Sequence, residues 1–110
     1  MAEGSKVITT GGIIGWDANE QFVSTDLVPQ FEQTLKNIVA ILAEAGAGPQ
    51  HLVRLTWFIT DKQAYKANLR AIGAIYRDVI GRHFPPMAVV EVKSLMEDDA
   101  KVEIEATAVI

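Results

Sequence analysis

The last ten residues, KVEIEATAVI (101–110), alternate between apolar and polar side chains with a period of two. This alternation is typical of a β-strand that buries one face and leaves the other open. One side carries Val102, Ile104, Ala106, Ala108 and Ile110, and the other carries Lys101, Glu103, Glu105, Thr107 and Val109. The strand therefore needs a layer that covers its apolar side, and the rest of the chain has to supply it.

Two amphipathic segments can supply that layer. The first, residues 24–48, has apolar residues three and four positions apart on one face: Phe31, Leu35, Ile38, Val39 and Leu42. Ser24 or Asp26 is expected to cap its start. The second segment runs from Asp61 to Gly81, and its apolar face comprises Tyr65, Leu69, Ile72, Tyr76 and Val79. Both segments are predicted to be helices.

Three further segments, 6–16, 51–60 and 87–95, are predicted to be strands. The first is interrupted by Gly11-Gly12, which indicates a turn, a bulge or a close approach of another group. In the second, the side expected to be buried holds Val53, Leu55, Trp57 and Ile59, and the opposite side holds Arg54, Thr56, Phe58 and Thr60. The order strand, helix, strand, helix, strand, strand predicts an α+β two-layer sandwich, with a mixed β-sheet and two helices on one face. The mixture of polar and apolar side chains on the uncovered face favours an interface between subunits.

Composition limits the possible functions. With 110 residues the chain is long enough for one domain, residues 1–110, and its 49% of apolar residues is typical of a globular protein. A net charge of -4 argues against a protein that grips a nucleic-acid backbone, and there is no cysteine for a disulfide or a zinc site. No segment predicts a signal peptide or a membrane span, so a cytoplasmic protein without a membrane partner is expected.

Few side chains fit a known catalytic pattern. His51 and His83 lack the spacing of metal ligands, so no metal site is predicted, and the glycines of TGGIIG lack the spacing of a nucleotide-binding loop. Glu103 and Glu105 share a strand face and could carry out acid–base chemistry if they were buried. The alternative is a solvated edge or part of an interface, which the residues alone favour. Neither alternative is excluded by the residues.

An ordered series of segments resembles the RidA/YjgF/UK114 family. The segments are TTGG after the first strand, FEQTLKNIVAILAEAGA, HLVRLTWFITD, the proline turn before VVEV, and the closing VEIEATAV, and together they span about Val7 to Val109. The resemblance implies a chorismate-mutase-like α+β fold, a homotrimer, and clefts between subunits that bind a small metabolite. It also implies hydrolysis of reactive enamines or imines to a carbonyl compound and ammonia, with no metal or organic cofactor.

The family's functional positions match this sequence only in part. The small hydroxyl residue and the glycine of the early strand fall on Thr10 and Gly11, and the acid that holds the hydrolytic water falls on Glu103. The arginine that binds the substrate carboxylate falls on Met87, and methionine cannot form a charge-assisted pair with a carboxylate. A helix asparagine of the catalytic branch aligns with Arg70. The sequence therefore resembles the branches of the family that lack the arginine.

The loss of the arginine leaves three functions open. The protein could be an enamine or imine deaminase with an altered substrate that lies against Met87 and Trp16, with Glu103 as the catalytic residue. It could bind a small metabolite without turnover, or it could serve as a protein-interaction scaffold. The structural alternatives are packing roles for Met87 and Trp16 and an ordinary strand role for Thr10.

Overall fold

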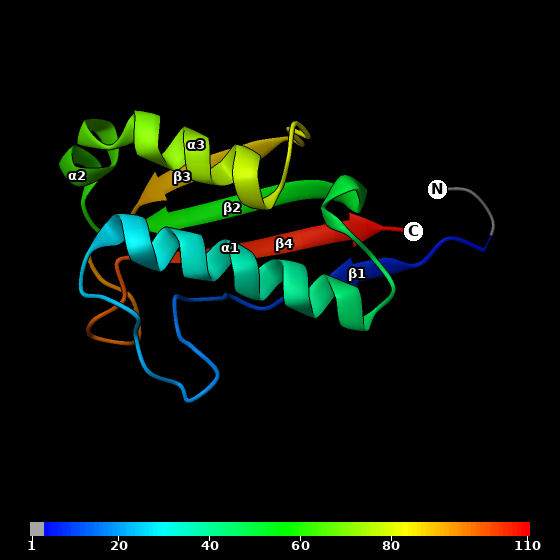
Figure 1. Ribbon diagram of the computed structural model, residues 1–110, viewed down its shortest axis with the longest axis horizontal. Coiled ribbons are helices and arrows are strands. Elements are labelled where there is room, and N and C mark those ends of the chain that lie inside the picture. Colours follow the sequence, from blue (N-terminus) through cyan, green and yellow to red (C-terminus); the bar gives the residue numbers. More distant parts are fainter. Residues whose placement is uncertain (1–3) are drawn as a thin grey trace.

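The computed structural model describes residues 4–110 and consists of two layers, a sheet and a set of helices (Figure 1). The elements, in chain order, are β1 (Val7–Thr9), α1 (Leu27–Glu44), a short 3₁₀ helix η1 (Pro49–His51), β2 (Leu52–Ile59), α2 (Lys62–Ala67), α3 (Leu69–Val79), β3 (Met87–Glu91) and β4 (Val102–Val109). Over residues 4–110 the strand order is β1-β4-β2-β3, with β2 and β3 parallel and the other pairs antiparallel. The predicted α+β sandwich with a mixed sheet is confirmed.

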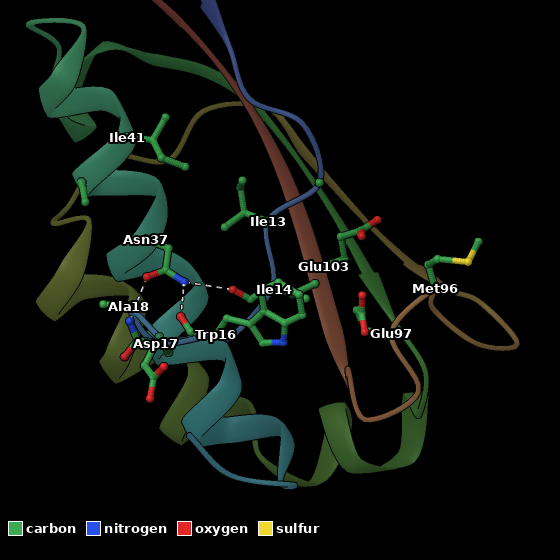
Figure 2. Close-up of a pocket in the computed structure, with 13 residues that line it drawn as sticks. Ile13, Ile14, Trp16, Asp17, Ala18, Asn37, Ile41, Met96, Glu97 and Glu103 are labelled. Atoms are coloured by element: carbon green, nitrogen blue, oxygen red, sulfur yellow. Dashed lines mark hydrogen bonds between the residues drawn. The ribbon is translucent and has the colours of Figure 1, made fainter. Parts of the chain in front are cut away.

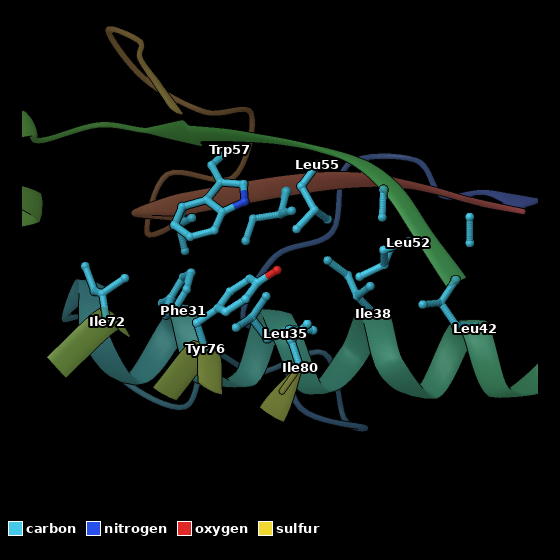
Figure 3. Packing of buried hydrophobic residues seen from close by; sticks show 14 of the residues in the cluster. Phe31, Leu35, Ile38, Leu42, Leu52, Leu55, Trp57, Ile72, Tyr76 and Ile80 are labelled. Carbon is cyan, nitrogen blue, oxygen red and sulfur yellow. The ribbon is translucent and has the colours of Figure 1, made fainter. Parts of the chain in front are cut away.

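The hydrophobic core lies between one face of the sheet and the buried faces of α1 and α3, the second of which contributes Ile72 and Tyr76 and is followed by Ile80 (Figure 3). The stripe predicted for the first helix is buried at Phe31, Leu35, Ile38 and Leu42, and these side chains pack against Leu52, Leu55 and Trp57 of β2. The alternation predicted for the last strand is also confirmed, because Val102, Ile104, Ala106 and Ala108 are buried. Full burial of a large apolar side chain contributes about 1.5–3 kcal/mol, so these contacts stabilise the fold substantially.

Helix α1 begins and ends close to the predicted positions. Asp26 occupies the N-cap position but its carboxylate accepts no capping hydrogen bond; instead the Asp26 N–H donates to Ser24 Oγ at 3.0 Å. The helix ends before Gly46, whose φ of 76° lies in the left-handed region that glycine adopts without strain. Within residues 4–110 no helix is both long and apolar enough to cross a membrane.

The second predicted helix is two helices, α2 and α3, separated at Asn68. The Asn68 backbone leaves the helical region (φ -119°, ψ 19°), and its side-chain Nδ2 donates to the Ala64 carbonyl at 2.7 Å. This local hydrogen bond competes with a continuous helix, as asparagine side chains often do. The break also changes the apolar face, because Leu69 is 53% exposed instead of buried, whereas Ile72 and Tyr76 are buried as predicted.

Strand β2 departs from strict alternation near its start. The pairing with β4 shifts register between Leu52 and Arg54, so that an extra residue, Val53, stands in a bulge. Leu52 is consequently buried and Val53 is 45% exposed, which corrects the prediction that Val53 faces the core. From Leu55 onward the alternation is as predicted, with Leu55, Trp57 and Ile59 buried.

The first predicted strand, 6–16, is interrupted after Thr9. The chain leaves the sheet at Gly11-Gly12 and returns at Ile13, whose N–H donates to the Ile104 carbonyl at 2.8 Å and whose carbonyl accepts from the Ile104 N–H at 2.9 Å. Strand β3 is also shorter than the predicted 87–95, because it ends at Glu91. The sheet face that points away from the helices carries the predicted mixture: Arg54, Thr56, Phe58, Glu103, Glu105 and Thr107.

Candidate functional site

A cavity of about 700 Å³ lies between the loop 12–18, the outer face of α1 and the loop that leads into β4 (Figure 2). Its volume is in the range of small-molecule binding sites. The apolar part of its lining is Ile13, Ile14, Trp16, Ala18, Ala40, Ile41 and Met96. The polar part is two amides, Gln33 and Asn37, and three acids, Asp17, Glu97 and Glu103.

Glu103 is the one acid of this cavity that a strand holds in place. It lies opposite Phe58 in the β2–β4 ladder, on the sheet face away from the helices, and it is half-buried. The backbone of Gly12 passes directly over its carboxylate, so closely that a Cβ atom on Gly12 would be 2.5 Å from the Glu103 Cδ atom. The Ile13–Ile104 hydrogen bonds fix the loop in this position, and the carboxylate is thereby held at the cavity wall.

Two amides of α1 hold the loop that carries Trp16. Asn37 Nδ2 donates to the Ile14 carbonyl at 3.0 Å and to the Trp16 carbonyl at 2.8 Å, and Gln33 Nε2 donates to Asn37 Oδ1 at 2.8 Å (Figure 2). The Trp16 ring packs edge-on against Phe22, with the ring centres 6.0 Å apart. The indole is therefore fixed from both sides, by a hydrogen-bonded backbone and by an aromatic neighbour.

The structure places Thr10 and Gly11 outside this cavity. The Thr10 hydroxyl accepts from the Ala106 N–H at 3.0 Å and donates to the Gly11 carbonyl at 2.7 Å, while the Thr10 N–H donates to the Ala106 carbonyl at 2.9 Å. The side chain thus continues the ladder where the chain starts to leave the sheet. Thr10 lines a smaller cavity of about 250 Å³ on the uncovered sheet face, together with Arg54 and Glu105. Gly11 is exposed and lines neither of the two cavities.

Met87 and Arg70 also lie away from the cavity. Met87 is the first residue of β3, pairs in register with the buried Leu55, and packs half-buried against the core. Arg70 is exposed on α3. Of the predicted site residues, the single chain therefore brings together Glu103 and Trp16 and separates them from Thr10, Gly11 and Met87. The functional roles of all five stay predictions.

The charge of the cavity is one-sided. Among the described residues that line it there are three carboxylates and no lysine, arginine or histidine. In the single chain the charged side chains of this lining are therefore all acidic. Nor do residues 4–110 bring three His, Cys, Asp or Glu side chains close enough together to hold a metal ion.

Known proteins are similar to this chain over nearly its whole length. A family model described as endoribonuclease L-PSP matches residues 2–110. The 2-iminobutanoate/2-iminopropanoate deaminase of Salmonella typhimurium is 36% identical, over 96% of this chain and 80% of that protein. The chain belongs to the RidA/YjgF/UK114 family. Protein DfrA of Myxococcus xanthus is also similar, at 35% identity over 99% of this chain and 80% of its own length.

Solved structures agree with the family assignment. The Rid-family protein YyfB of Yersinia pestis superposes with a TM-score of 0.85 at 32% identity, over 96% of this chain and 79% of that one. TdcF of Escherichia coli, solved with bound serine, gives a TM-score of 0.81 at 29% identity, over 100% of this chain and 84% of that one. The RidA-like fold is therefore established for this chain.

Three residues of the site were not found from the sequence. Gln33 and Asn37 lie on the polar side of α1, where amides usually face water, and nothing in their spacing indicates a contact with the loop. Gly12 had only the general signal of a glycine pair, which predicts a turn, a bulge or a close approach without saying which. The structure shows that Gly12 makes the close approach, to Glu103.

Proposed function

We propose that this chain is a cytoplasmic, homotrimeric imine or enamine deaminase that needs no metal or organic cofactor. The observation that carries the proposal is the Glu103 carboxylate, held by a strand and a glycine at the wall of a mainly apolar cavity that also contains Trp16. Its support is the similarity to relatives named 2-iminobutanoate/2-iminopropanoate deaminase.

The arrangement suits hydrolysis of a C=N bond. Glu103 removes a proton from a water molecule as the water oxygen attacks the imine carbon, and the π electrons of the C=N bond move to nitrogen. The protonated carboxyl group passes that proton to the nitrogen. The carboxylate then takes the proton of the new hydroxyl group and delivers it to the nitrogen as the C–N bond breaks, so that the nitrogen leaves as ammonia and the carboxylate is regenerated. In sum, an imine and one water give a carbonyl compound and ammonia.

The substrate is expected to differ from that of relatives with the family arginine. The resemblance assigns the carboxylate contact to the position of Met87, whose side chain has no donor for a hydrogen bond. A charge-assisted contact with a carboxylate contributes about 1.5–3 kcal/mol, so its loss weakens the binding of small 2-imino acids by roughly 10- to 100-fold.

Trimer formation is the second part of the proposal. The uncovered sheet face carries Phe58 beside Thr56 and Thr107, a composition closer to an interface than to a solvated surface. Light scattering at micromolar concentration is expected to give the mass of three chains. A monomer under these conditions would contradict this part of the proposal.

Glu103→Gln tests the catalytic part. The amide keeps the shape of the side chain but cannot accept a proton, so ammonia release from an imine formed in situ should fall by at least about 100-fold. Glu105→Gln is the matched control, because Glu105 lies on the same strand face but outside the 700 Å³ cavity. It should keep the rate within about threefold of wild type, the change expected for a surface charge. Equal loss in the two variants, or full activity in Glu103→Gln, would reject the role of Glu103.

A second candidate function is metabolite binding without turnover. It is favoured by Thr10, because its hydroxyl already donates its proton to the Gly11 carbonyl and accepts from the Ala106 N–H, so it has no proton left to donate to a substrate. A protein that binds a ligand in the cavity and accelerates hydrolysis of no imine would have this function.

A further inference from the structure

We infer that Gln30, a buried residue of α1, is a positioning residue of the proposed deaminase: its side-chain amide determines where the Glu103 carboxylate lies. The inference rests on the proposed function and deepens it. Gln30 does not line the cavity, and its exposed fraction is 0% within the single chain, so a partner subunit does not touch it. The relation between Gln30 and Glu103 therefore holds however a partner completes the site.

The side-chain amide of Gln30 joins two loops. Its Nε2 donates to the Ser24 carbonyl and to the Asp99 carbonyl, both at 2.8 Å, and its Oε1 accepts from the Lys101 N–H at 2.7 Å. Only a primary amide offers two N–H donors beside an acceptor oxygen, and asparagine is shorter by one methylene group. The loop before α1 and the loop before β4 are thereby tied together at the start of α1 (Figure 1).

The contacts with Asp99 and Lys101 fix the point at which the chain enters β4. Lys101 stands directly before the strand, and Ala100, between the two contacts, is buried. Glu103 follows two residues after Lys101, on the sheet face away from the helices. Because successive side chains of a strand point to opposite faces, a slip of one residue here would turn Glu103 toward the core. A smaller displacement would move its carboxylate relative to the substrate.

The backbone of Gln30 also supports the loop that covers Glu103. A Cβ atom on Gly15 would lie 2.8 Å from the Gln30 carbonyl oxygen and 2.9 Å from its Cα, so the loop 12–18 rests directly on this turn of α1. Gly12 of the same loop passes over the Glu103 carboxylate. The two supports of Glu103, its strand and the loop above it, therefore both lead back to Gln30.

Gln30→Met tests this role, because it keeps the length of the side chain and removes all three hydrogen bonds. Ser24, Asp99 and Lys101 are exposed or half-buried, so water can replace the amide and the chain still folds. The entry to β4 is then no longer fixed, and displacement of a catalytic group by about 1 Å lowers a rate by on the order of 100-fold. We expect kcat for ammonia release to fall by about 10- to 100-fold, with KM within about threefold of wild type.

Thr34→Val is the matched control. Thr34 is also 0% exposed, and its hydroxyl donates to the Gln30 carbonyl at 2.7 Å, a hydrogen bond inside α1. The substitution removes a buried hydrogen bond but leaves the contacts of the Gln30 amide with both loops, so kcat should stay within about threefold of wild type. Equal losses of kcat in Gln30→Met and Thr34→Val would mean that any loosening of α1 slows the reaction, and would overturn the inference.

Gln30→Glu gives a second, pH-dependent readout. Its carboxylate would face two carbonyl oxygens and repel both, whereas its protonated form can donate to one of them. The kcat of Gln30→Glu, divided by that of Gln30→Met at the same pH, should therefore rise as the pH is lowered from about 8 to about 6. This ratio cancels the titration of neighbouring acids, which both variants share. A ratio that does not change with pH would contradict the inference, and so would loss of the folded structure in both variants at every pH, seen by circular dichroism.

An NMR measurement separates this inference from the proposed function. The side-chain carboxyl carbon of Glu103, assigned from the resonance that disappears in Glu103→Gln, reports the surroundings of the carboxylate without turnover. Its resonance should shift in Gln30→Met and stay unchanged in Thr34→Val. If the wild-type protein accelerates hydrolysis of no imine, the deaminase is rejected, and a shifted resonance still supports the control of Glu103 by Gln30. An unchanged resonance in Gln30→Met overturns the inference, whatever the rates.

Discussion

Gly12→Ala should damage catalysis without damaging the fold, because the atoms nearest to an added methyl group all belong to Glu103. The Cβ of an alanine at this position would lie 2.5 Å from Glu103 Cδ, 2.7 Å from Oε2 and 2.8 Å from Cγ. Non-bonded carbon atoms approach to about 3.5–4.0 Å, so the carboxyl group has to retreat by roughly 1 Å. The end of a flexible side chain can make this movement, whereas the backbone around it stays in place.

The two consequences differ in size. The free energy of unfolding should change by less than about 1 kcal/mol, since the loss of favourable packing is offset by the reduced freedom of the unfolded chain when glycine is replaced. Displacement of a catalytic group by about 1 Å can lower a rate by on the order of 100-fold. Urea unfolding and the kcat for ammonia release, measured on the same preparation, separate the two effects.

Two comparisons show whether the effect passes through Glu103. An alanine at Gly11 would meet no atom within 4 Å, so Gly11→Ala should keep the rate within about threefold of wild type. In a Glu103→Gln background, Gly12→Ala should cause almost no further loss, because the two changes act on one group. A normal kcat for Gly12→Ala, or a full additional loss in the Glu103→Gln background, would refute the assignment of the carboxylate.

Two stability predictions concern the core. The Trp57 indole N–H is buried and has no hydrogen-bond partner among the described residues. Trp57→Phe should therefore change the free energy of unfolding by less than about 1 kcal/mol. The smaller ring loses packing, but the substitution also removes an unsatisfied donor. A loss above about 3 kcal/mol in urea unfolding would contradict this prediction and show that the lost packing far outweighs the removal of the unsatisfied donor. Burial raises the pKa of the Tyr76 phenol above 10.0, so its stabilising contribution is complete below that pH and falls as the pH rises from 10.0 through the folded-state pKa. Tyr76→Phe removes the hydrogen bond from the Tyr76 hydroxyl to the His83 carbonyl. It should also flatten the fall in the free energy of unfolding at alkaline pH. An equally steep fall in the variant would show that other groups cause it.

The elements whose buried positions repeat at a regular spacing could be predicted from the sequence. The features that depend on a single side chain could not. The period of two in β4 and the stripe of α1 are visible because each buried position needs an apolar residue. The break at Asn68 depends on one side-chain hydrogen bond to Ala64, and the bulge at Val53 depends on the register with β4. Neither leaves a pattern in the sequence, so both were predicted wrongly.

The residues of the candidate site could be predicted from the sequence only in part. The family resemblance predicts Glu103 as a site residue, whereas the alternation alone favours a solvated edge or an interface. Its neighbour in the cavity, Trp16, was also expected, but Asn37 and Gln33 were not, since a helix gives no sign of which loop crosses its polar face. The sequence placed Thr10 with Glu103, whereas in the single chain the hydroxyl of Thr10 is engaged by the backbone of Ala106 and Gly11.

2-Phenylethylamine is a stable mimic of a protonated imine. A crystal structure of the protein with this amine tests most directly that the cavity beside Glu103 is the site of imine chemistry. We expect the ammonium group within hydrogen-bonding distance of the Glu103 carboxylate, the phenyl ring on the Trp16 indole, and the loop 12–18 held by Asn37 as in the free protein. An amine bound on the uncovered sheet face beside Thr10 and Arg54, with the cavity at Glu103 empty, would contradict the proposal.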